Sequence, residues 1–320
     1  MKAIVLKKNG GIENFQYTTT DQPTIQTGEV LVKVKAIAIN PVDVFVRQQE
    51  FGLQHFLKPA PGQDTFILGW DIAGDVEEVG PGVTAFKKGD AVFGMVNFPG
   101  QGKAYAEYVA APAAHLALKP DNITYEEAAA ASLAALTAWQ ALVTYAKIRQ
   151  GDKVLIHAAA GGVGHYAVQI AKHFGAYVTG TASAAHKDFV LGLGADEFID
   201  YKNEKFEEQV QNADIVLDPI YGEEHVLRSL QAVKKGGRVI TLLTAFEGKP
   251  AEKAKEKDLY THLLSVVSNG ADEAQLAELL KAGKVKSHIA GSYNFEDLPK
   301  AHQQQESGTK GGKIVVLLQS

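Results

Sequence analysis

A glycine-rich segment in the middle of the chain places the strongest constraint on the fold. Residues 157–167 read HAAAGGVGHYA, after the apolar run DKVLI and before VQIAKHFGA. Where a strand passes into a helix, glycines allow the backbone to approach a pyrophosphate, which then lies at the positive end of the helix. The segment predicts a dinucleotide site, and a tight turn without a ligand is the alternative. The predicted binding residues are Gly161, Gly162, Val163 and Gly164.

Strands and helices alternate from residue 124 onward. Thr124 and Glu127 form a capping-box pattern at the start of an alanine-rich helix. The expected strands are KVLIHAA, AYVTGTA, EFIDY, DIVLDPI and GRVITLL, and the expected helices are VGHYAVQIAKHFG and AAHKDFVLGLG. This order predicts an α/β fold in which helices cover both faces of a doubly wound parallel sheet.

Both ends of the chain have the pattern of short strands. EVLVKVKAIAIN alternates over its charged half, and DIAGDVEEVG, DAVFGMV and YAEYVAAP are further strands bounded by glycine or proline. The tail returns to strands in HIAGSYNF and KIVVLLQ. We therefore expect a β-rich domain at residues 1–123, an α/β domain at 124–265 and a return to the first domain at 266–320. An inserted α/β domain explains why the glycine loop is central.

Composition disfavours several classes of protein. The 320 residues carry a net charge of −5 and no cysteine, so the chain offers no basic field for nucleic acid and no cysteine-based chemistry. Residues 128–146 are uncharged but rich in alanine, which predicts a buried helix and no membrane span. The apolar run in the N-terminal MKAIVLKKNG is too short for a signal peptide. We expect a soluble, cytoplasmic protein.

The residues after the second expected strand of the α/β domain indicate which dinucleotide binds. NAD-binding folds carry an acidic residue about 20 positions after the glycine loop, where it holds the ribose hydroxyls. Ala182 and Ser183 occupy that region here, followed by His186 and Lys187. Because no carboxylate would repel a 2′-phosphate, the sequence favours NADPH over NADH, with Ser183 and Lys187 as candidate contacts. Alternatively, Lys187 is a solvated helix residue.

Several longer segments spread over the whole chain carry a family resemblance. They include GEVLVKVKAIAINPVDVFVR, LGWDIAGDVEEVG, GDKVLIHAAAGGVG, LGADEFIDY and ESGTKGGKIVVLL. Together they resemble the medium-chain dehydrogenase/reductase superfamily, in its zinc-free quinone oxidoreductase branch. The resemblance implies a GroES-like catalytic domain built from both chain ends, a Rossmann domain between them, an active site in the cleft separating the two, and a homodimer.

The resemblance also implies that no metal takes part in the reaction. Zinc-dependent relatives carry a catalytic cysteine where this chain has Asn40, and a zinc histidine where it has Trp70. The four cysteines of their structural-zinc lobe are absent as well. Lewis-acid activation of an alcohol is therefore not expected, and alcohol oxidation is disfavoured.

For the cofactor, the resemblance implies contacts at several positions. Lys187 matches a lysine that holds the 2′-phosphate, Tyr201 a tyrosine beside the adenosine end, and Thr137 a threonine near the nicotinamide half. The strand end TLLTAF, which contains Leu243, would pass its backbone beside the nicotinamide. Two tail lysines, Lys310 and Lys313, are further candidates to reach the cofactor phosphate.

Hydride transfer to a quinone, or to an alkene conjugated to a carbonyl, moves negative charge onto oxygen. That oxygen requires a hydrogen-bond donor. Asn40 is the predicted donor, because its amide occupies the vacated metal position. Alternatively, or in addition, Asn40 caps the helix that Pro41 begins.

The rest of the segment NPVDVFVR supplies further candidates around the acceptor. Asp43, grouped with Asn40 as a catalytic candidate, stands four residues before Arg47, and the two are expected to pair on one helix face and orient the loop. Phe45, Trp70 and Arg47 are the candidate substrate residues. The two aromatic side chains would wall a planar acceptor, or else belong to the core.

Two other patterns carry no function in this interpretation. Tyr201 and Lys205 fit the Tyr-x-x-x-Lys pattern of short-chain reductases, but those enzymes carry the pair on a helix far beyond the glycine loop, and here it follows within about 40 residues. His157, His165 and His173 recur every eight residues, which is not a metal spacing. We expect them to be packing or surface residues.

The sequence therefore predicts an NADPH-dependent, zinc-independent reductase that transfers hydride to a quinone or an α,β-unsaturated carbonyl. A reductase of enoyl thioesters is the nearest alternative, and residues 51–67 would shape either pocket. From another class, the chain would be an NADPH-binding redox sensor or a crystallin-like protein with little turnover.

Overall fold

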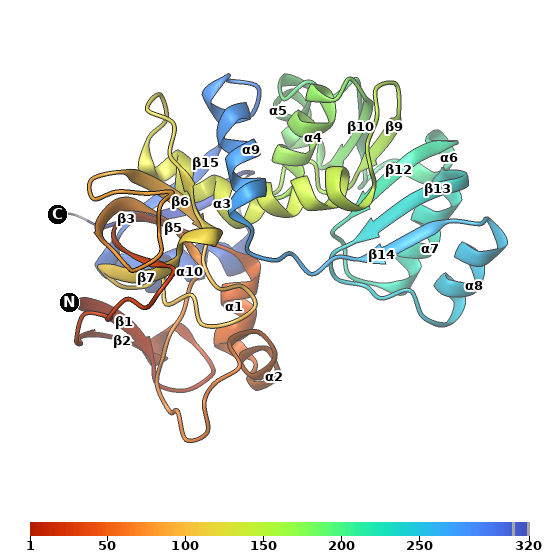
Figure 1. Ribbon diagram of the computed structural model, residues 1–320. Coiled ribbons are helices and arrows are strands. Elements are labelled where there is room, and N and C mark those ends of the chain that lie inside the picture. The colour runs from red at the N-terminus through yellow and green to blue at the C-terminus, as the bar shows by residue number, and fades with distance from the viewer. Residues whose placement is uncertain (309–310, 319–320) are drawn as a thin grey trace. The chain divides into compact units, whose positions relative to one another are not determined.

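The structure is a computed structural model that describes residues 1–308 and 311–318. Met1–Leu136 and Val267–Ser320 form one compact unit, the β-rich unit, and Thr137–Val266 form a second, the Rossmann unit (Figure 1). This arrangement confirms the expected fold class. The first division lies at residue 137 instead of the expected 124, because the chain passes from one unit to the other within a helix.

The β-rich unit holds a seven-stranded and a three-stranded sheet within its described residues. The larger has the order β15-β16-β3-β5-β6-β8, with β7 paired to β3, and the smaller has the order β2-β1-β4. The strands are β1 (Lys2–Leu6), β2 (Phe15–Thr19), β3 (Glu29–Ile39), β4 (Phe66–Ile67), β5 (Asp71–Val79), β6 (Ala91–Met95), β7 (Tyr108–Pro112), β8 (Ala117–Leu118), β15 (Ile289–Asn294) and β16 (Lys313–Leu317).

Helices and helical turns connect these strands. They are η1 (Ile12–Asn14), α1 (Pro41–Gln48), α2 (Glu50–Gly52), η2 (Leu53–Leu57), η3 (Ala113–His115), α9 (Gly270–Lys281), η6 (Phe295–Asp297) and α10 (Leu298–Ser307). Helix α1 leaves the end of β3, and α10 packs against α1, β15 and β16. The first and last parts of the chain therefore build one surface around α1.

The pairing of β16 with β3 unites the two ends of the chain. The strands are antiparallel in the register Ile314↔Ile39. Residue Lys313 therefore enters the sheet beside the point where β3 ends and Asn40 begins the turn into α1. The residues of β16 are buried or nearly so, as the apolar run KIVVL predicts.

The Rossmann unit is a six-stranded parallel sheet with the order β11-β10-β9-β12-β13-β14. Its strands are β9 (Lys153–Ile156), β10 (Tyr177–Ala182), β11 (Glu197–Asp200), β12 (Ala213–Asp218), β13 (Val233–Thr241) and β14 (Tyr260–Leu263). The order reverses between β9 and β12, which in such sheets opens the crevice that binds a ligand.

Helices pack on this sheet as the alternating pattern predicts (Figure 1). They are α4 (Gly164–His173), η5 (Ala184–His186), α5 (Lys187–Gly192), α6 (Phe206–Gln209), α7 (Glu223–Ala232) and α8 (Gly248–Glu256). Helix α4 packs against β9 and β10, and α7 against β12 and β13. The lysine-rich stretch 249–258, expected as an exposed loop or helix start, lies mostly in α8.

Helix α3 (Tyr125–Trp139) continues as the π-helical segment η4 (Gln140–Tyr145). The capping box is confirmed: the Thr124 N–H donates to Glu127 Oε2 at 2.8 Å, and the Glu127 N–H donates to Thr124 Oγ1 at 3.2 Å. Among the described residues, Tyr125–Tyr145 is the stretch long and apolar enough to cross a membrane, yet 83% of its apolar window is buried inside the structure. That burial is typical of a core helix.

The glycine loop joins β9 to α4, as the sequence predicts. Gly161 donates its N–H to the Ala158 carbonyl at 2.8 Å and accepts from the His165 N–H at 3.1 Å. A Cβ on Gly164 would lie 2.1 Å from the Ala158 oxygen and 2.8 Å from the Cα of Ala159, so only glycine fits where the helix begins. Close backbone packing therefore fixes this turn.

Replacing Gly164 with alanine is expected to destabilise the Rossmann unit by about 2 kcal/mol or more, because the atoms that the new Cβ meets are backbone. Gly192→Ala is the matched control, since a Cβ at that helical position meets nothing within 4 Å. Urea unfolding should show a lower midpoint for Gly164→Ala and an unchanged or slightly higher one for Gly192→Ala. Equal midpoints for both variants would contradict this account of the loop.

Candidate functional site

Helix α1 begins at the residue that the sequence singles out. Asn40 is the N-cap, with φ −124° and ψ 158°, and Pro41 is the first helical residue. The Asn40 backbone N–H donates to Asp43 Oδ2 at 2.7 Å, which satisfies a donor that the helix leaves unpaired. Asn40 therefore occupies the expected N-cap position, although the bond that closes the turn runs from its backbone N–H and its side-chain oxygen binds Lys313. Asp43 orients the start of the helix.

The Asn40 side chain lies between a carboxylate and an ammonium. Its Nδ2 donates to Asp71 Oδ2 at 2.8 Å. Its Oδ1 accepts a hydrogen bond from Lys313 Nζ, which also donates to the Ile39 carbonyl at 3.1 Å. Asn40, Asp71 and Lys313 are 1%, 0% and 3% exposed, so the three polar groups satisfy one another in the interior.

The acids of this cluster have raised pKa values. Burial raises the pKa of Asp71 to about 6, although Lys313 and the Asn40 amide oppose the shift. Burial and the neighbouring Asp71 raise the pKa of Asp43 to about 7. Burial and Asp71 also raise the pKa of Glu273, on α9, well above its usual value. Burial lowers the pKa of Lys313, whereas Asp71 and Asp43 favour its charged form.

Arg47 does not pair with Asp43, and that expectation is wrong. The guanidinium, 0% exposed, donates from Nη1 to the Gly10 carbonyl at 2.9 Å and forms an ion pair with Glu306 on α10. Asp43 and Arg47 lie one helical turn apart but bind different partners, Asn40 and Glu306. Glu306 lies on α10, so the spacing of residues within α1 could not predict its pairing with Arg47. Arg47 fixes α1 to the N-terminal loop and α10.

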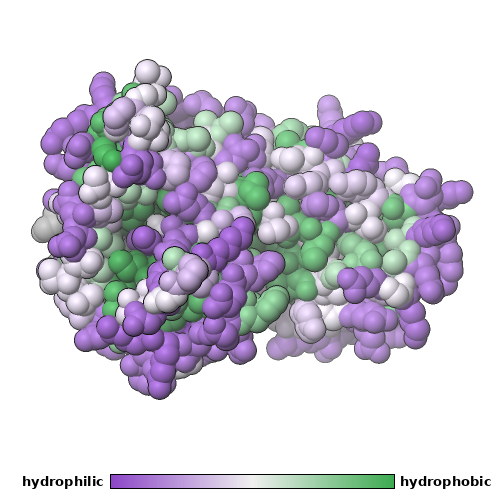
Figure 2. Space-filling view, turned by 60° about the horizontal axis from the view of Figure 1, so that its bottom comes forward, coloured by the Kyte–Doolittle hydropathy of each residue, from purple (hydrophilic) through white to green (hydrophobic). Residues whose placement is uncertain are grey.

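Of the two candidate aromatic walls, one is exposed and one is buried. Phe45 is 40% exposed, whereas Trp70 is 0% exposed and donates its indole N–H to the Gly100 carbonyl at 2.7 Å. Trp70 packs edge-on against Phe98, with ring centroids 5.0 Å apart. The face in Figure 2 is mostly hydrophilic with separate hydrophobic patches. Phe45 is thus available to a ligand, and Trp70 belongs to the core.

The candidate cofactor residues of the Rossmann unit gather at the carboxyl ends of its strands. The glycine loop follows β9, Ser183 follows β10, Tyr201 follows β11, and Leu243 lies just after β13. Thr137 is 5% exposed and lies in the last turn of α3. In parallel sheets these ends share one edge, so the structure brings the strand-end candidates to the same side of the sheet.

Three candidates for the adenosine end are neighbours. The Tyr201 N–H donates to the Ala182 carbonyl at 3.2 Å, which joins the ends of β10 and β11. Ser183 directly follows Ala182, and Lys187 begins α5 after one helical turn. Tyr201 is 55% exposed, and the Lys187 side chain is also exposed. The tyrosine and the lysine are therefore free to meet a ligand.

An acid does end the neighbouring strand: Asp200 is the last residue of β11, opposite Ala182 at the end of β10. Its carboxylate accepts from the Lys202 N–H at 3.2 Å and from Asn203 Nδ2 at 2.6 Å. Asp200 therefore organises its own turn, and the absence of an acid directly after β10 is as the sequence predicts.

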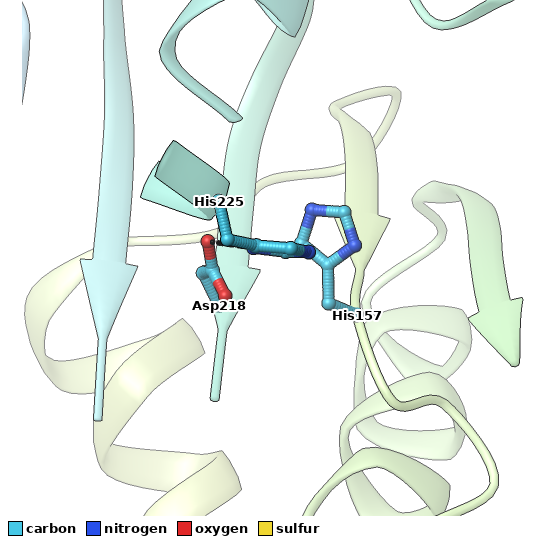
Figure 3. A group of neighbouring side chains, drawn as sticks. All are labelled: His157, Asp218 and His225. Carbon is cyan, nitrogen blue, oxygen red and sulfur yellow. Dashed lines mark hydrogen bonds and ion pairs between the residues drawn. The ribbon is translucent and has the colours of Figure 1, made fainter. Parts of the chain in front are cut away.

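A buried polar network connects β9, β12 and α7 at the switch point of the sheet (Figure 3). His157 bonds through Nδ1 to Thr181 Oγ1 at 3.0 Å and through Nε2 to Ser229 Oγ at 3.1 Å. Asp218 Oδ2 accepts from Ser229 Oγ at 2.7 Å and pairs with His225 Nδ1 at 3.0 Å.

Burial lowers the pKa of His157 to about 3, so its ring is neutral at physiological pH. Burial opposes ionisation of Asp218, but the hydrogen bond from His225 lowers the pKa of this carboxyl below its usual value. His157, Asp218 and His225 place possible metal-ligand atoms within 4.8 Å of one another. Both His157 nitrogens already have partners, so we interpret the group as the scaffold that holds the end of β9 beneath the glycine loop. His157 is thus a packing residue, as expected.

Sequence reasoning missed the roles of Asp71, Glu273 and Lys313. Lys313 was expected to reach the cofactor phosphate, and this is wrong, because its ammonium is buried against Ile39 and Asn40. Its companion Lys310 lies outside the described residues. The sequence did contain one indication of these roles. Lys313 and Asp71 are each a single charged residue at the start of an apolar strand, in KIVVLL and DIAG. A charge at such a position is expected to find a buried partner.

Comparison with known proteins agrees with this fold. The family model for alcohol dehydrogenase GroES-like domains matches residues 26–121, and the one for zinc-binding dehydrogenases matches residues 193–316. The quinone oxidoreductase of Mus musculus is 32% identical over 336 residues, covering 99% of this chain and 98% of that protein. The chloroplastic NADPH-dependent alkenal/one oxidoreductase of Arabidopsis thaliana is 34% identical over 326 residues, covering 99% and 79%.

Among solved structures, the quinone oxidoreductase from Coxiella burnetii superposes with a TM-score of 0.90. It is 32% identical in sequence, and the match covers 100% of this chain and 99% of that one. The likeness therefore extends over both units and is not confined to the common Rossmann fold.

A catalytic zinc, for which the second family model is named, does not fit the residues around Asn40. Zinc sites are built from thiolate, imidazole and carboxylate ligands, and the sequence has no cysteine. At the two positions where the resemblance implies zinc ligands in zinc-dependent relatives, the Asn40 amide is bonded to Asp71 and Lys313, and the Trp70 indole to Gly100. The Lys313 ammonium, 4.0 Å from Asp71 Oδ2, opposes a metal cation beside it.

Asp43→Asn tests the electrostatics of this cluster. The folded-state pKa of about 7 exceeds the unfolded value of about 3.9, so the folded protein holds this proton between those pH values. The contribution of Asp43 to the free energy of unfolding therefore falls as the pH rises through that window. Asparagine cannot ionise, so the variant should gain stability relative to wild type between pH 5 and pH 8, on the order of 2–3 kcal/mol.

Urea unfolding at several pH values measures this difference, with Asp21→Asn, at an exposed position, as the control. A difference between wild type and Asp43→Asn that does not change with pH would contradict the raised pKa.

Proposed function

The chain belongs to the medium-chain dehydrogenase/reductase family, and we propose that it is an NADPH-dependent, zinc-independent reductase that transfers hydride to a quinone or an α,β-unsaturated carbonyl. The observation that carries the proposal is the strand–GGVG–helix junction together with Ser183 and Lys187 after β10, where NAD-specific folds carry an acid. The acceptor class is supported by the relatives named as quinone and alkenal/one oxidoreductases.

We assign the cofactor to the carboxyl edge of the Rossmann sheet. The pyrophosphate would lie against the loop at the N-terminus of α4, where backbone N–H groups and the helix dipole favour an anion. Ser183, Lys187 and Tyr201 would hold the adenosine end with its 2′-phosphate. Thr137 and the backbone of Leu243 would face the nicotinamide. The pyrophosphate contacts are assigned to Gly161, Gly162, Val163 and Gly164.

We assign the acceptor to the surface around α1. Bound NADPH supplies the hydride, and the chain supplies a donor for the charge that develops on the acceptor oxygen. Asn40 Nδ2 carries two hydrogens, of which one is donated to Asp71, and the second is assigned to that oxygen. Asp43 holds Asn40 through its backbone N–H, and the exposed Phe45 would contact a planar acceptor.

Arg47 and Trp70 would act indirectly in this assignment. Arg47 is bound to Gly10 and Glu306, and the Trp70 indole N–H is bound to Gly100, so these side chains would support the residues around Asn40 and are not assigned to the acceptor oxygen. We further propose a cytoplasmic homodimer joined through the β14 edge of the Rossmann sheet. Tyr260 and Leu263 on this strand are 45% and 43% exposed.

The decisive experiment follows NADPH absorbance with a quinone, a 2-alkenal, an enone and an enoyl thioester as acceptors. We expect rapid oxidation of NADPH with the quinone, the alkenal or the enone, slower oxidation of NADH, and no effect of EDTA. Loss of activity in EDTA would contradict zinc independence, and a preference for the thioester would favour the enoyl reductase. Tight NADPH binding without acceptor-dependent oxidation would favour a binding protein.

Lys187→Ala tests the cofactor assignment. Removing a cation from the 2′-phosphate should raise the Kd for NADPH about tenfold, on the scale of one charge-assisted hydrogen bond, and leave the Kd for NADH unchanged. Lys255→Ala, at an exposed position on α8, is the control. Binding measured by fluorescence titration decides the outcome. Equal weakening of both cofactors, or of neither, would remove Lys187 from the site.

A further inference from the structure

Lys313 makes buried contacts that the cofactor assignment does not use. Its Nζ donates to the Ile39 carbonyl and to Asn40 Oδ1, and it lies 4.0 Å from Asp71 Oδ2. Buried pairs of opposite charge generally stabilise a fold no more than apolar side chains of similar volume would. A lysine and an aspartate held in the interior around one amide therefore indicate a role beyond stability.

The two charges determine which way the Asn40 amide faces. An ammonium only donates hydrogen bonds, and an ionised carboxylate only accepts them. The amide must therefore turn its oxygen to Lys313 and its nitrogen to Asp71. A flipped amide would set N–H groups against the ammonium and oxygen against the carboxylate. Asp71 is itself held in place, because its Oδ1 accepts from the Leu133 N–H at 2.9 Å.

The ammonium also strengthens the amide as a donor. A charged donor on the amide oxygen withdraws electron density from the nitrogen, and hydrogen bonds in a chain polarise one another. Lys313, Asn40 and Asp71 are all nearly inaccessible to water, so the effect is not screened by solvent. The N–H groups of Asn40 are thus both oriented and more acidic than those of a solvated amide.

We propose that Lys313 is a positioning residue of the reductase reaction, which orients and polarises the Asn40 amide so that its remaining N–H meets the acceptor oxygen as negative charge develops there. This inference rests on the proposed function, because it gives the Asn40 donor its task. The positive charge that supports the Asn40 donor is that of Lys313, which β16 brings to this point through its pairing with β3.

The test separates this role from a structural one by removing both charges together. Lys313→Met alone leaves Asp71 buried without a counter-ion and is expected to be unstable. Lys313→Met combined with Asp71→Asn removes both charges of the pair and should restore the unfolding midpoint. Lys313→Gln combined with Asp71→Asn is a second neutral pair that keeps a hydrogen-bond donor. Lys88→Met is the control, because Lys88 forms an exposed ion pair with Glu77 in the same unit.

For each variant, the unfolding midpoint, the Kd for NADPH, and kcat and KM for the best acceptor are measured. We expect both neutral pairs to bind NADPH within about twofold of wild type but to lose about tenfold or more in kcat, on the scale that misplacement of a reacting group produces. Lys313→Arg, which keeps the charge, should retain more activity than either neutral pair. The control should match wild type throughout.

Recovery of kcat together with stability in the neutral pairs would overturn the inference, since a structural role predicts that result. In that case the wild type is still an active reductase, and the proposed function stands. Wild-type protein that oxidises NADPH with none of the acceptors would overturn both.

Discussion

The antiparallel pairing of β16 with β3 is the interaction on which the β-rich unit depends. It joins the last strand to one of the first and carries a lysine into the interior at the point where β3 ends. That charge is retained only because Asn40 and Asp71 meet it there. The same contacts orient the amide that begins α1. The register of β16 on β3 therefore joins the two ends of the chain in one sheet. It also places Lys313 against the Asn40 amide, the donor at the proposed acceptor site.

In the Rossmann unit, the glycine loop is shaped by close contacts between backbone atoms and not by buried charges. The pyrophosphate of the proposed cofactor would require free N–H groups at a helix end. Gly164 allows α4 to begin there, because its missing side chain lets the helix pack closely on the Ala158 backbone. Beneath the loop, the network of His157, Ser229 and Asp218 ties β9 to β12 and α7 with neutral and ionised groups that all have partners. These hydrogen bonds hold the end of β9, from which the glycine loop begins, and would support the proposed cofactor site.

The local features of the fold were predictable from sequence, and the long-range ones were not. The strand and helix pattern, the capping box at Thr124 and the position of Asn40 before α1 all depend on residues close together in the chain. The partners of Lys313 and Arg47 depend on the register of β16 and the approach of α10, which no spacing within one segment reveals. The charge at the start of the apolar run KIVVLL was the one indication in the sequence. It predicts that Lys313 has a buried partner but does not identify that partner.

The most direct test of the account is a single-turnover measurement with NADPH deuterated separately on each face of the nicotinamide. We predict direct hydride transfer from one fixed face. Oxidation in the presence of a quinone or an enone should therefore be slowed by deuterium on one face only, and chelators should not change the rate. Equal rates for both labelled forms and for unlabelled NADPH, or transfer that fails in chelator, would contradict a metal-free hydride transfer by this chain.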